Sequence, residues 1–203
     1  MSPLLTKILF AAASYLAGAF PTGYLLVRAR QKKDIRDFGS GATGATNVLR
    51  LQGWRGALPV ALVDILKGFL PALAAARMFS DPGFPALCAS LAVLGHCFPV
   101  YIGFRGGKGV ATAGGAMLAI APGAAGLSFA VFVLTVVLTR YVSLGSVLAA
   151  LAFPGFLLLL GAPVRAALWS LPLLAVILAR HAGNLRRLRR GEERKLGRKD
   201  PAP

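Results

Sequence analysis

Residues 4–27 read LLTKILFAAASYLAGAFPTGYLLV, and this stretch decides the class of fold because Lys7 is its only charge. As a helix rising 1.5 Å per residue, its roughly 24 residues cross a hydrocarbon core of about 30 Å. A secretory signal peptide would have a basic start and a shorter apolar core. The glycines and the proline near the end of the stretch, followed by Arg28, favour a membrane span that is retained.

The composition of the 203-residue chain agrees with a polytopic membrane protein. Hydrophobic residues make up 56% of it and charged residues only 15%, whereas about a quarter of a soluble domain is charged. The 23 Lys and Arg residues against 7 Asp and Glu residues give a formal charge of +16, which on a soluble protein would suggest nucleic acid. Here the basic residues lie in short blocks between apolar runs. We therefore expect membrane lipids, and no nucleic acid, as partners.

Further apolar runs follow, separated by glycine, proline or charged residues. They cover residues 57–78, 84–104, 110–120, 124–139, 144–160 and 166–178. Together with residues 4–27 they predict an all-α polytopic bundle of seven transmembrane helices. The run at 110–120 falls short of the usual 20 or so residues, so it needs extension through Pro122 or follows a re-entrant path.

The basic residues in short loops predict the orientation of the bundle. With the N-terminus outside, most of the 23 Lys and Arg residues fall on the cytoplasmic side. The exceptions are Lys7, Arg77 and Arg165 outside and Lys67 within a span. The same count predicts a cytoplasmic C-terminus.

No internal repeat or linker divides the chain, so residues 1–203 are predicted to form a single domain with a basic cytoplasmic tail at 185–203. This tail would also attract anionic lipid headgroups. Cys88 and Cys97 lie in one apolar run and match no zinc spacing. They are predicted to be unpaired core thiols.

Polar clusters fall on the predicted cytoplasmic side, and the first follows the first span. Its glycines allow backbone N–H groups to converge on an anion, and the Arg50 guanidinium suits a phosphate. A dinucleotide-binding loop is excluded because no strand precedes it, and a Walker A loop because Ala45 stands where lysine is required. A flexible polar loop remains the alternative. The candidate site residues here are Gly39, Ser40, Gly41, Thr43, Gly44, Thr46, Asn47 and Arg50.

The second cluster, at the start of the run at 110–120, consists of Gly106, Gly107, Lys108 and Gly109. Three glycines let the chain wrap closely around an oxyanion while Lys108 supplies charge. The N-terminus of the following helix points its positive dipole at the same place. A plain turn with basic residues that face the cytoplasm is the alternative.

The third cluster is Asp64 and Lys67, three residues apart within the second span. The two side chains share a helix face, and because ions are costly in hydrocarbon they are predicted to pair toward the bundle interior. Lys67 is then either structural or a support for substrate binding. His96, in the third span, is predicted to be a satisfied core residue.

The fourth cluster combines Ser143 with His181, Asn184 and Arg187, which share one face at the inner end of the last helix. There a base or a hydrogen-bonding group could meet a substrate, although a plain helix-capping histidine is the alternative. No nucleophile elbow, Cys–His pair beside a basic loop or carboxylate cluster for a metal is present. Catalysis is therefore expected to rest on orienting substrates and stabilising charge, with no metal, cofactor or covalent intermediate.

Five stretches of the sequence, in order, resemble the PlsY family, the bacterial acyl-phosphate:glycerol-3-phosphate acyltransferases. They are GSGATGATNVLR at 39–50, Asp64-x-x-Lys67-Gly68, Gly95-His96-x-Phe98-Pro99 leading into Phe104-x-Gly106-Gly107-Lys108-Gly109-Val110-Ala111-Thr112, Arg140-Tyr141-Val142-Ser143-Leu144, and His181-x-x-Asn184-x-x-Arg187-Leu188-x-x-Gly191-x-Glu193.

The resemblance implies transfer of a fatty acyl group from acyl phosphate to the 1-hydroxyl of sn-glycerol 3-phosphate. The products are lysophosphatidic acid and phosphate, in the first acylation step of phospholipid biosynthesis. It implies that neither acyl-CoA nor acyl-carrier protein is the donor, and that a 1-acylglycerol-3-phosphate acyltransferase acts next. It also implies a bacterial plasma (inner) membrane location with the active site on the cytoplasmic side.

Among single residues, the resemblance implies that the Lys108 loop binds glycerol 3-phosphate and that Ser40 and Arg50 are required in the first loop. It places His181 and Asn184 in the site, so Ser40, His181 and Asn184 are the catalytic candidates. Glu193 would support the structure of the tail.

Both lines of reasoning converge on two anion sites for two phosphate-bearing substrates. The glycerol hydroxyl would attack the acyl-phosphate carbonyl directly, with His181 or the departing phosphate accepting the proton. A transporter for phosphorylated metabolites would use the same cations, but transporters usually show paired halves, which this sequence lacks. A non-catalytic membrane scaffold is the other alternative.

Overall fold

All regular structure in residues 2–197, the part of the chain that the computed structural model describes, is helical. Two short 3₁₀ turns, η1 (Ile35–Asp37) and η2 (Val100–Ile102), lie in loops. The α-helices are α1 (Pro3–Ala19), α2 (Thr22–Gln31), α3 (Ala45–Gln52), α4 (Trp54–Met78), α5 (Phe84–Cys97), α6 (Val110–Ile120), α7 (Pro122–Thr139), α8 (Val142–Leu159) and α9 (Val164–Arg189). The prediction of an all-α fold is confirmed.

The stretch at 4–27, predicted as one uninterrupted helix, is broken between α1 and α2. Proline has no N–H to continue the helical ladder and disfavours a helical conformation in the residue before it, so Pro21 ends α1 at Ala19. Just after the break, Gly23 lies against the carbonyl of Thr43 so closely that a Cβ atom would collide with it. The break therefore lets the first loop pack against α2.

One helical region goes beyond the sequence prediction: helix α3 lies within the first loop, where no helix was predicted. Helix α9 continues past the apolar run at 166–178 to Arg189, so His181, Asn184 and Arg187 lie on the last helix as predicted and the first part of the predicted tail is helical. Basic side chains in its last turn favour this extension because they face the negative end of the helix dipole. The predicted tail at 198–203 lies outside the described residues.

Six helical segments in residues 2–197 are long and apolar enough to cross a membrane, α1 and α2 together forming the first. Helix α6, with 11 residues, is shorter, as its sequence indicates. Large apolar side chains cover the outside of the bundle; Leu138 and Leu159 are each 73% exposed. Such a surface suits lipid rather than water.

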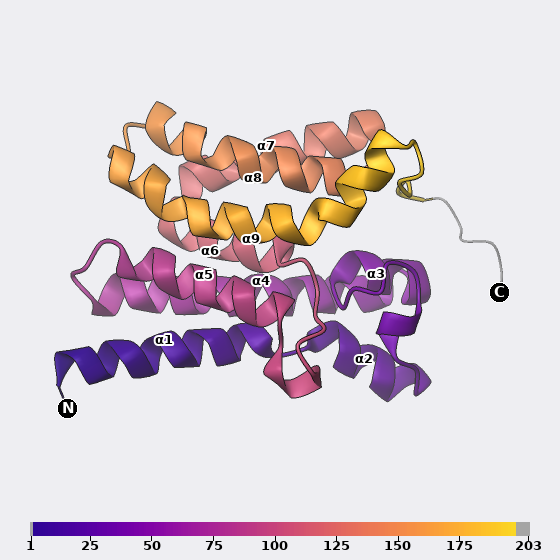
Figure 1. Ribbon diagram of the computed structural model, residues 1–203, viewed down its shortest axis with the longest axis horizontal. Helices are drawn as coiled ribbons and strands as arrows, with labels where there is room; N and C mark the ends of the chain where they lie inside the picture. Colours follow the sequence, from indigo (N-terminus) through magenta and orange to yellow (C-terminus); the bar gives the residue numbers. More distant parts are fainter. Residues whose placement is uncertain (1, 198–203) are drawn as a thin grey trace.

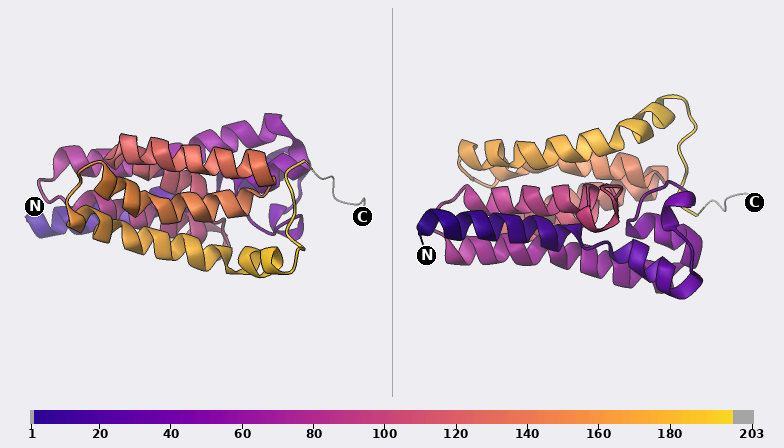
Figure 2. Two further views of the ribbon diagram at one scale, coloured as in Figure 1. Left: turned by 90° about the horizontal axis from the view of Figure 1, so that it is seen from above. Right: turned by 60° about the horizontal axis from the view of Figure 1, so that its bottom comes forward.

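The long helices lie side by side along the longest axis of the molecule, with the N-terminus at one end and α2, α3 and the end of α9 at the other (Figure 1). Glycines allow close approaches between them: Gly95 of α5 lies against α1, and Gly68 of α4 lies against the Thr112 carbonyl of α6. The C-terminal segment after α9 turns back across the end of the bundle that carries α2 and α3 (Figure 2). All four predicted polar clusters therefore belong to one half of the molecule.

Candidate functional site

The first loop is shaped by positive backbone angles and by one buried amide. Gly39 and Gly41 have φ values of +59° and +67°, a region that side chains rarely adopt. Asn47, on the first turn of α3, donates from Nδ2 to the carbonyl oxygens of Phe38 (3.0 Å) and Ala42 (2.9 Å). Its Oδ1 accepts from the backbone N–H of Ser40 at 3.1 Å. Asn47 thus holds the loop in shape, and its amide is engaged within the loop.

The remaining candidates of this loop differ in exposure. The side chains of Ser40 and Arg50 are exposed, and Thr43 is only 5% exposed beneath them. Gly44 is the N-cap residue of α3, and Thr46 lies half-buried in its first turn. The exposed serine hydroxyl and guanidinium are therefore the groups of the loop that are accessible at its surface.

The glycine loop, residues 106–109, folds against the end of α5. The backbone N–H of Gly106 donates to the Cys97 carbonyl at 3.2 Å, and that of Gly107 donates to the His96 carbonyl at 3.1 Å. A Cβ atom on Gly106 would meet the His96 carbonyl, and one on Gly107 would meet the His96 ring. Gly109 has a φ of +77° and precedes the first residue of α6. The glycines are thus required by space and by backbone angle.

Arg180 of α9 holds the other side of the glycine loop. Its Nε donates to the Gly107 carbonyl at 3.0 Å and its Nη2 to the Gly106 carbonyl at 3.2 Å. The guanidinium also lies over the aromatic ring of Phe98, 5.2 Å from the ring centroid. Because the next residue is His181, Arg180 joins the helix that carries one candidate group to the loop that carries Lys108.

His181 is 1% exposed and its Nδ1 lies 2.8 Å from the Ile177 carbonyl oxygen. A carbonyl can only accept a hydrogen bond, so Nδ1 carries the proton when the ring is neutral. Nε2 then has a lone pair that can accept a proton or a hydrogen bond. This is the tautomer that a base acting through Nε2 requires.

Glu193, in the segment after α9, is the centre of the fourth cluster. Its Oε1 accepts from Ser143 Oγ (2.8 Å) and Asn184 Nδ2 (2.6 Å), and its Oε2 accepts from Arg187 Nε (2.8 Å). Burial would raise the pKa of Glu193, but the three hydrogen bonds outweigh it and hold that pKa below its usual value. The carboxylate therefore stays charged and ties the C-terminal segment to α8 and α9.

Lys108 is where the clusters meet. Burial lowers the pKa of its ammonium group to about 8; Glu193 opposes this shift, and Arg187, Arg50 and Arg180 add to it. These neighbours come from the first loop, from α9 and from the C-terminal segment. Several cations near one partly desolvated lysine create a strong attraction for a phosphate.

Asp64 and Lys67 form the predicted ion pair inside the bundle, with Lys67 Nζ 2.8 Å from Asp64 Oδ1. The lysine also donates to the Phe20 carbonyl at 2.9 Å and is 8% exposed. Its ammonium is thus engaged between α4 and the break after α1. His96 is buried as predicted, with Nδ1 3.2 Å from Thr112 Oγ1.

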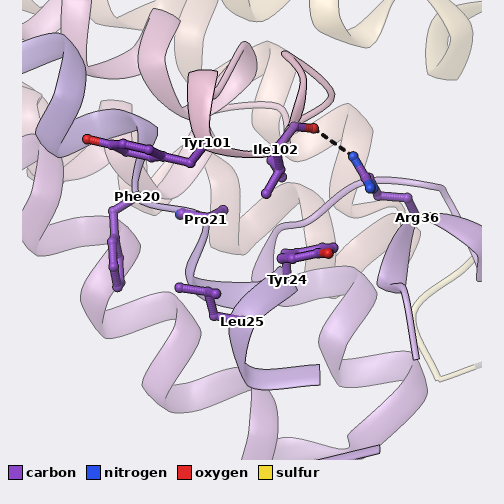
Figure 3. Close-up of a pocket in the computed structure, with 7 residues that line it drawn as sticks. All are labelled: Phe20, Pro21, Tyr24, Leu25, Arg36, Tyr101 and Ile102. Atoms are coloured by element: carbon purple, nitrogen blue, oxygen red, sulfur yellow. Dashed lines mark hydrogen bonds between the residues drawn. The ribbon is translucent and has the colours of Figure 1, made fainter. Parts of the chain in front are cut away.

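Sequence reasoning missed the link between the first loop and the loop after α5. Arg36 forms an ion pair with Asp34 at 2.7 Å and donates from Nη1 to the Ile102 carbonyl at 2.8 Å. No local pattern signals this contact, because the two residues are far apart in the chain. The link lies beside a cavity of about 410 Å³ that is lined by Phe20, Pro21, Tyr24, Leu25, Arg36, Tyr101 and Ile102 (Figure 3).

Comparison with known proteins shows the family of the chain. Residues 8–191 match the family model described as glycerol-3-phosphate acyltransferase. A glycerol-3-phosphate acyltransferase of Synechococcus elongatus is 44% identical, with 96% of each chain covered. One from Symbiobacterium thermophilum is 47% identical over 92% of this chain and 93% of the relative.

Two solved structures of PlsY, an integral membrane glycerol 3-phosphate acyltransferase, are similar throughout. The glycerol 3-phosphate form has a TM-score of 0.90 and 38% identity, and the lysophosphatidic acid form has 0.87 and 37%. Each comparison covers 95% of this chain and 96% of the other.

Proposed function

Because the chain belongs to the PlsY family of glycerol-3-phosphate acyltransferases, we propose that its acyl donor is acyl phosphate and its acceptor the 1-hydroxyl of sn-glycerol 3-phosphate. The products would be lysophosphatidic acid, seen in one form of the PlsY homologue, and inorganic phosphate. Membership of this family makes the chain a multi-pass membrane acyltransferase of lipid synthesis. The transporter and scaffold alternatives are thereby set aside.

The observation that carries the proposal is the convergence of cations on Lys108. Arg50 of α3 and Arg180 and Arg187 of α9 all act on this lysine, although the two helices are far apart in the chain. Two substrates that each bear a phosphate need two anion sites side by side. The first loop with Ser40 and Arg50 supplies one, and the glycine loop with Lys108 supplies the other.

We assign the glycerol 3-phosphate to the glycine loop and the acyl phosphate to the first loop. Gly39 and Gly44 of the first loop and Gly109 of the second would offer backbone N–H groups to the phosphates. The N–H groups of Gly41, Gly106 and Gly107 donate to the carbonyls of Phe38, Cys97 and His96, so these glycines would shape the loops instead. Asn47 supports the first loop, and Lys67 ties α4 to the break between α1 and α2, one helix before the first loop. Ser143 and Asn184 are positioned by Glu193, and Asn184 retains its Oδ1 as an acceptor for a substrate hydroxyl.

The proposed step is a direct acyl transfer. The 1-hydroxyl oxygen attacks the carbonyl carbon of the acyl phosphate, the new C–O ester bond forms, and the C–O bond to phosphate breaks. The hydroxyl proton passes to Nε2 of His181 or to the departing phosphate. The surrounding cations stabilise the negative charge that develops on the phosphate as it leaves.

We also propose seven membrane crossings with the N-terminus outside and the active site and C-terminus in the cytoplasm. The basic bias of the loops supports this orientation. The position of α6 supports the crossing count: its last residue, Ile120, lines an apolar cavity of about 190 Å³ together with Pro82 and Pro163, from the α4–α5 and α8–α9 turns. In this proposal, α6 together with the glycine loop before it forms the seventh crossing.

A phosphate-release assay tests the proposed donor. Purified protein should release phosphate from acyl phosphate only when glycerol 3-phosphate is present, in equal amount to the lysophosphatidic acid formed. Acyl-CoA should give no product under the same conditions. Product from acyl-CoA, or phosphate release that does not require glycerol 3-phosphate, would contradict the proposal.

The pH dependence should follow Lys108. With a pKa of about 8, its ammonium is mostly charged at pH 7 and loses its proton as the pH rises. We expect kcat/KM for glycerol 3-phosphate to fall about tenfold per pH unit above that pKa, because only the charged form binds phosphate well. Initial rates, corrected for spontaneous hydrolysis of acyl phosphate, measure this. The Lys108→Arg variant stays charged, so its residual activity should not fall over the same pH range. If the activity of this variant falls at high pH as it does in wild type, a group other than Lys108 causes the fall.

A further inference from the structure

A buried polar network lies directly beneath the glycine loop and joins four helical segments. Asp64 Oδ1 lies 2.8 Å from Lys67 Nζ, 3.3 Å from Thr22 Oγ1 and 3.7 Å from His96 Nδ1. Thr112 Oγ1 lies 3.2 Å from the same His96 nitrogen. The network therefore connects α2, α4, α5 and α6.

Burying this network costs free energy, because its polar and charged groups lose their contact with water. Asp64 is 1% exposed and His96 5%, within segments long and apolar enough to span a membrane. The second oxygen of the carboxylate, Oδ2, is buried and has no hydrogen-bond partner within residues 2–197. Apolar residues of similar size generally stabilise such a position as well or better. The arrangement suggests a role in positioning rather than in stability alone.

The glycine loop rests on His96. The His96 carbonyl accepts from the Gly107 N–H at 3.1 Å, and the imidazole Nε2 occupies the space that a Gly107 side chain would need. Gly107 directly precedes Lys108. Any rotation or displacement of the imidazole would therefore move the backbone that carries the lysine.

Thr112 is placed to prevent such a rotation. It is 0% exposed, lies three residues after Gly109 on α6, and holds the imidazole through Nδ1. Asp64 faces the same nitrogen from α4. The ring is thus held on one side by the buried network and packs on the other against the glycine loop.

We propose that His96, held by Thr112 and Asp64, is a positioning residue for glycerol 3-phosphate binding. It fixes how closely the glycine loop packs against the end of α5, and hence the position of Lys108. This rests on the proposed assignment of glycerol 3-phosphate to that loop. His96 itself need not touch the substrate.

Thr112→Val tests the proposal because it keeps the shape of the side chain and removes only its hydroxyl. We expect KM for glycerol 3-phosphate to rise about three- to tenfold, the value of one hydrogen bond, with kcat changed less than twofold. Thr112→Ser should restore the wild-type KM. Thr135→Val on α7 is the matched control, because its hydroxyl bonds only the Val131 carbonyl of its own helix at 2.7 Å; it should leave KM unchanged.

Gly107→Ala provides a second, independent variant should Thr112→Val fail to fold. The added methyl would press on the His96 ring from the side of the glycine loop while Thr112 and Asp64 keep their side chains, so KM should again rise more than kcat falls. Gly155→Ala on α8, where no atom lies within 4 Å of the new Cβ, controls for a glycine-to-alanine change. A wild-type KM in either folded test variant, with only the thermal midpoint lowered, would overturn the positioning role.

Lys108→Ala, measured in parallel, separates this inference from the proposed function. If Lys108→Ala binds glycerol 3-phosphate like wild type, the assignment of the glycine loop is wrong and the positioning role falls with it. If Lys108→Ala loses binding while Thr112→Val and Gly107→Ala do not, the loop assignment stands and only the inference fails.

Discussion

Replacing Lys108 by alanine should abolish acyl transfer, lowering kcat/KM for glycerol 3-phosphate by about a thousandfold. The variant loses the charged donor at the point where the cations of three segments meet, and removing one such preorganised group typically costs a hundred- to a thousandfold. Rates of lysophosphatidic acid formation by purified protein measure the effect.

This loss should come without loss of stability. The lowered pKa of Lys108 means that folding disfavours its charged form, so removing the charge relieves a cost below pH 8. The thermal midpoint of Lys108→Ala at pH 7 should be equal to or above that of wild type. Arg105→Ala is the matched control, since Arg105 is a basic residue exposed on the same connection. Retention of more than a tenth of wild-type activity by Lys108→Ala would contradict the assignment.

Replacing Glu193 by alanine should lower both activity and stability. The variant leaves Ser143, Asn184 and Arg187 without their shared acceptor, and breaking a buried charged network in this way costs about 3 kcal/mol. Since Arg187 is half-exposed, water can accept hydrogen bonds from its guanidinium in the variant and offset part of that cost. We expect a clear fall in the thermal midpoint and at least a hundredfold fall in kcat/KM, because Asn184 loses its orientation.

Glu192→Ala distinguishes the role of this carboxylate from a general effect of charge in the segment. Glu192 is the adjacent residue, carries the same charge and is exposed, so its loss should change neither measurement. Glu193→Gln should be intermediate, because an amide oxygen can still accept from Ser143 or Asn184 but pairs poorly with Arg187. Equal behaviour of Glu192→Ala and Glu193→Ala would show that the buried contacts do not matter.

Much of the fold could be predicted because membrane helices have a direct sequence signal. Apolar length predicted the spans, and the short run at 110–120 coincides with α6. Helix α3 was missed, since it depends on how the first loop packs against α2 and α4. The break at Pro21 was not predicted either, although its cause is the local effect of proline on the helix. The polar last turns of α9 were expected only from the helical spacing of His181, Asn184 and Arg187, because hydropathy does not detect polar turns.

The sequence predicted which residues belong to the candidate site better than it predicted which atoms they contact. Glycines beside cations indicated anion binding, and the ion pair of Asp64 with Lys67 followed from helical spacing. The roles of Asn47 as a loop support and of Arg180 as a clamp could not be predicted, because their partners are backbone carbonyls. Backbone atoms are the same in every residue, so no sequence pattern identifies which of them a side chain will reach.

The amino-acid sequence by itself determined that this chain crosses a membrane as helices and carries two glycine-rich basic loops, because hydropathy and backbone freedom are properties of each residue and its near neighbours. Only the tertiary structure decided that Lys108 and Glu193 come close enough to His181 to act on its charge, and that His96 lies under Gly107. Those placements depend on how the helices pack, and packing is set by contacts between residues far apart in the chain.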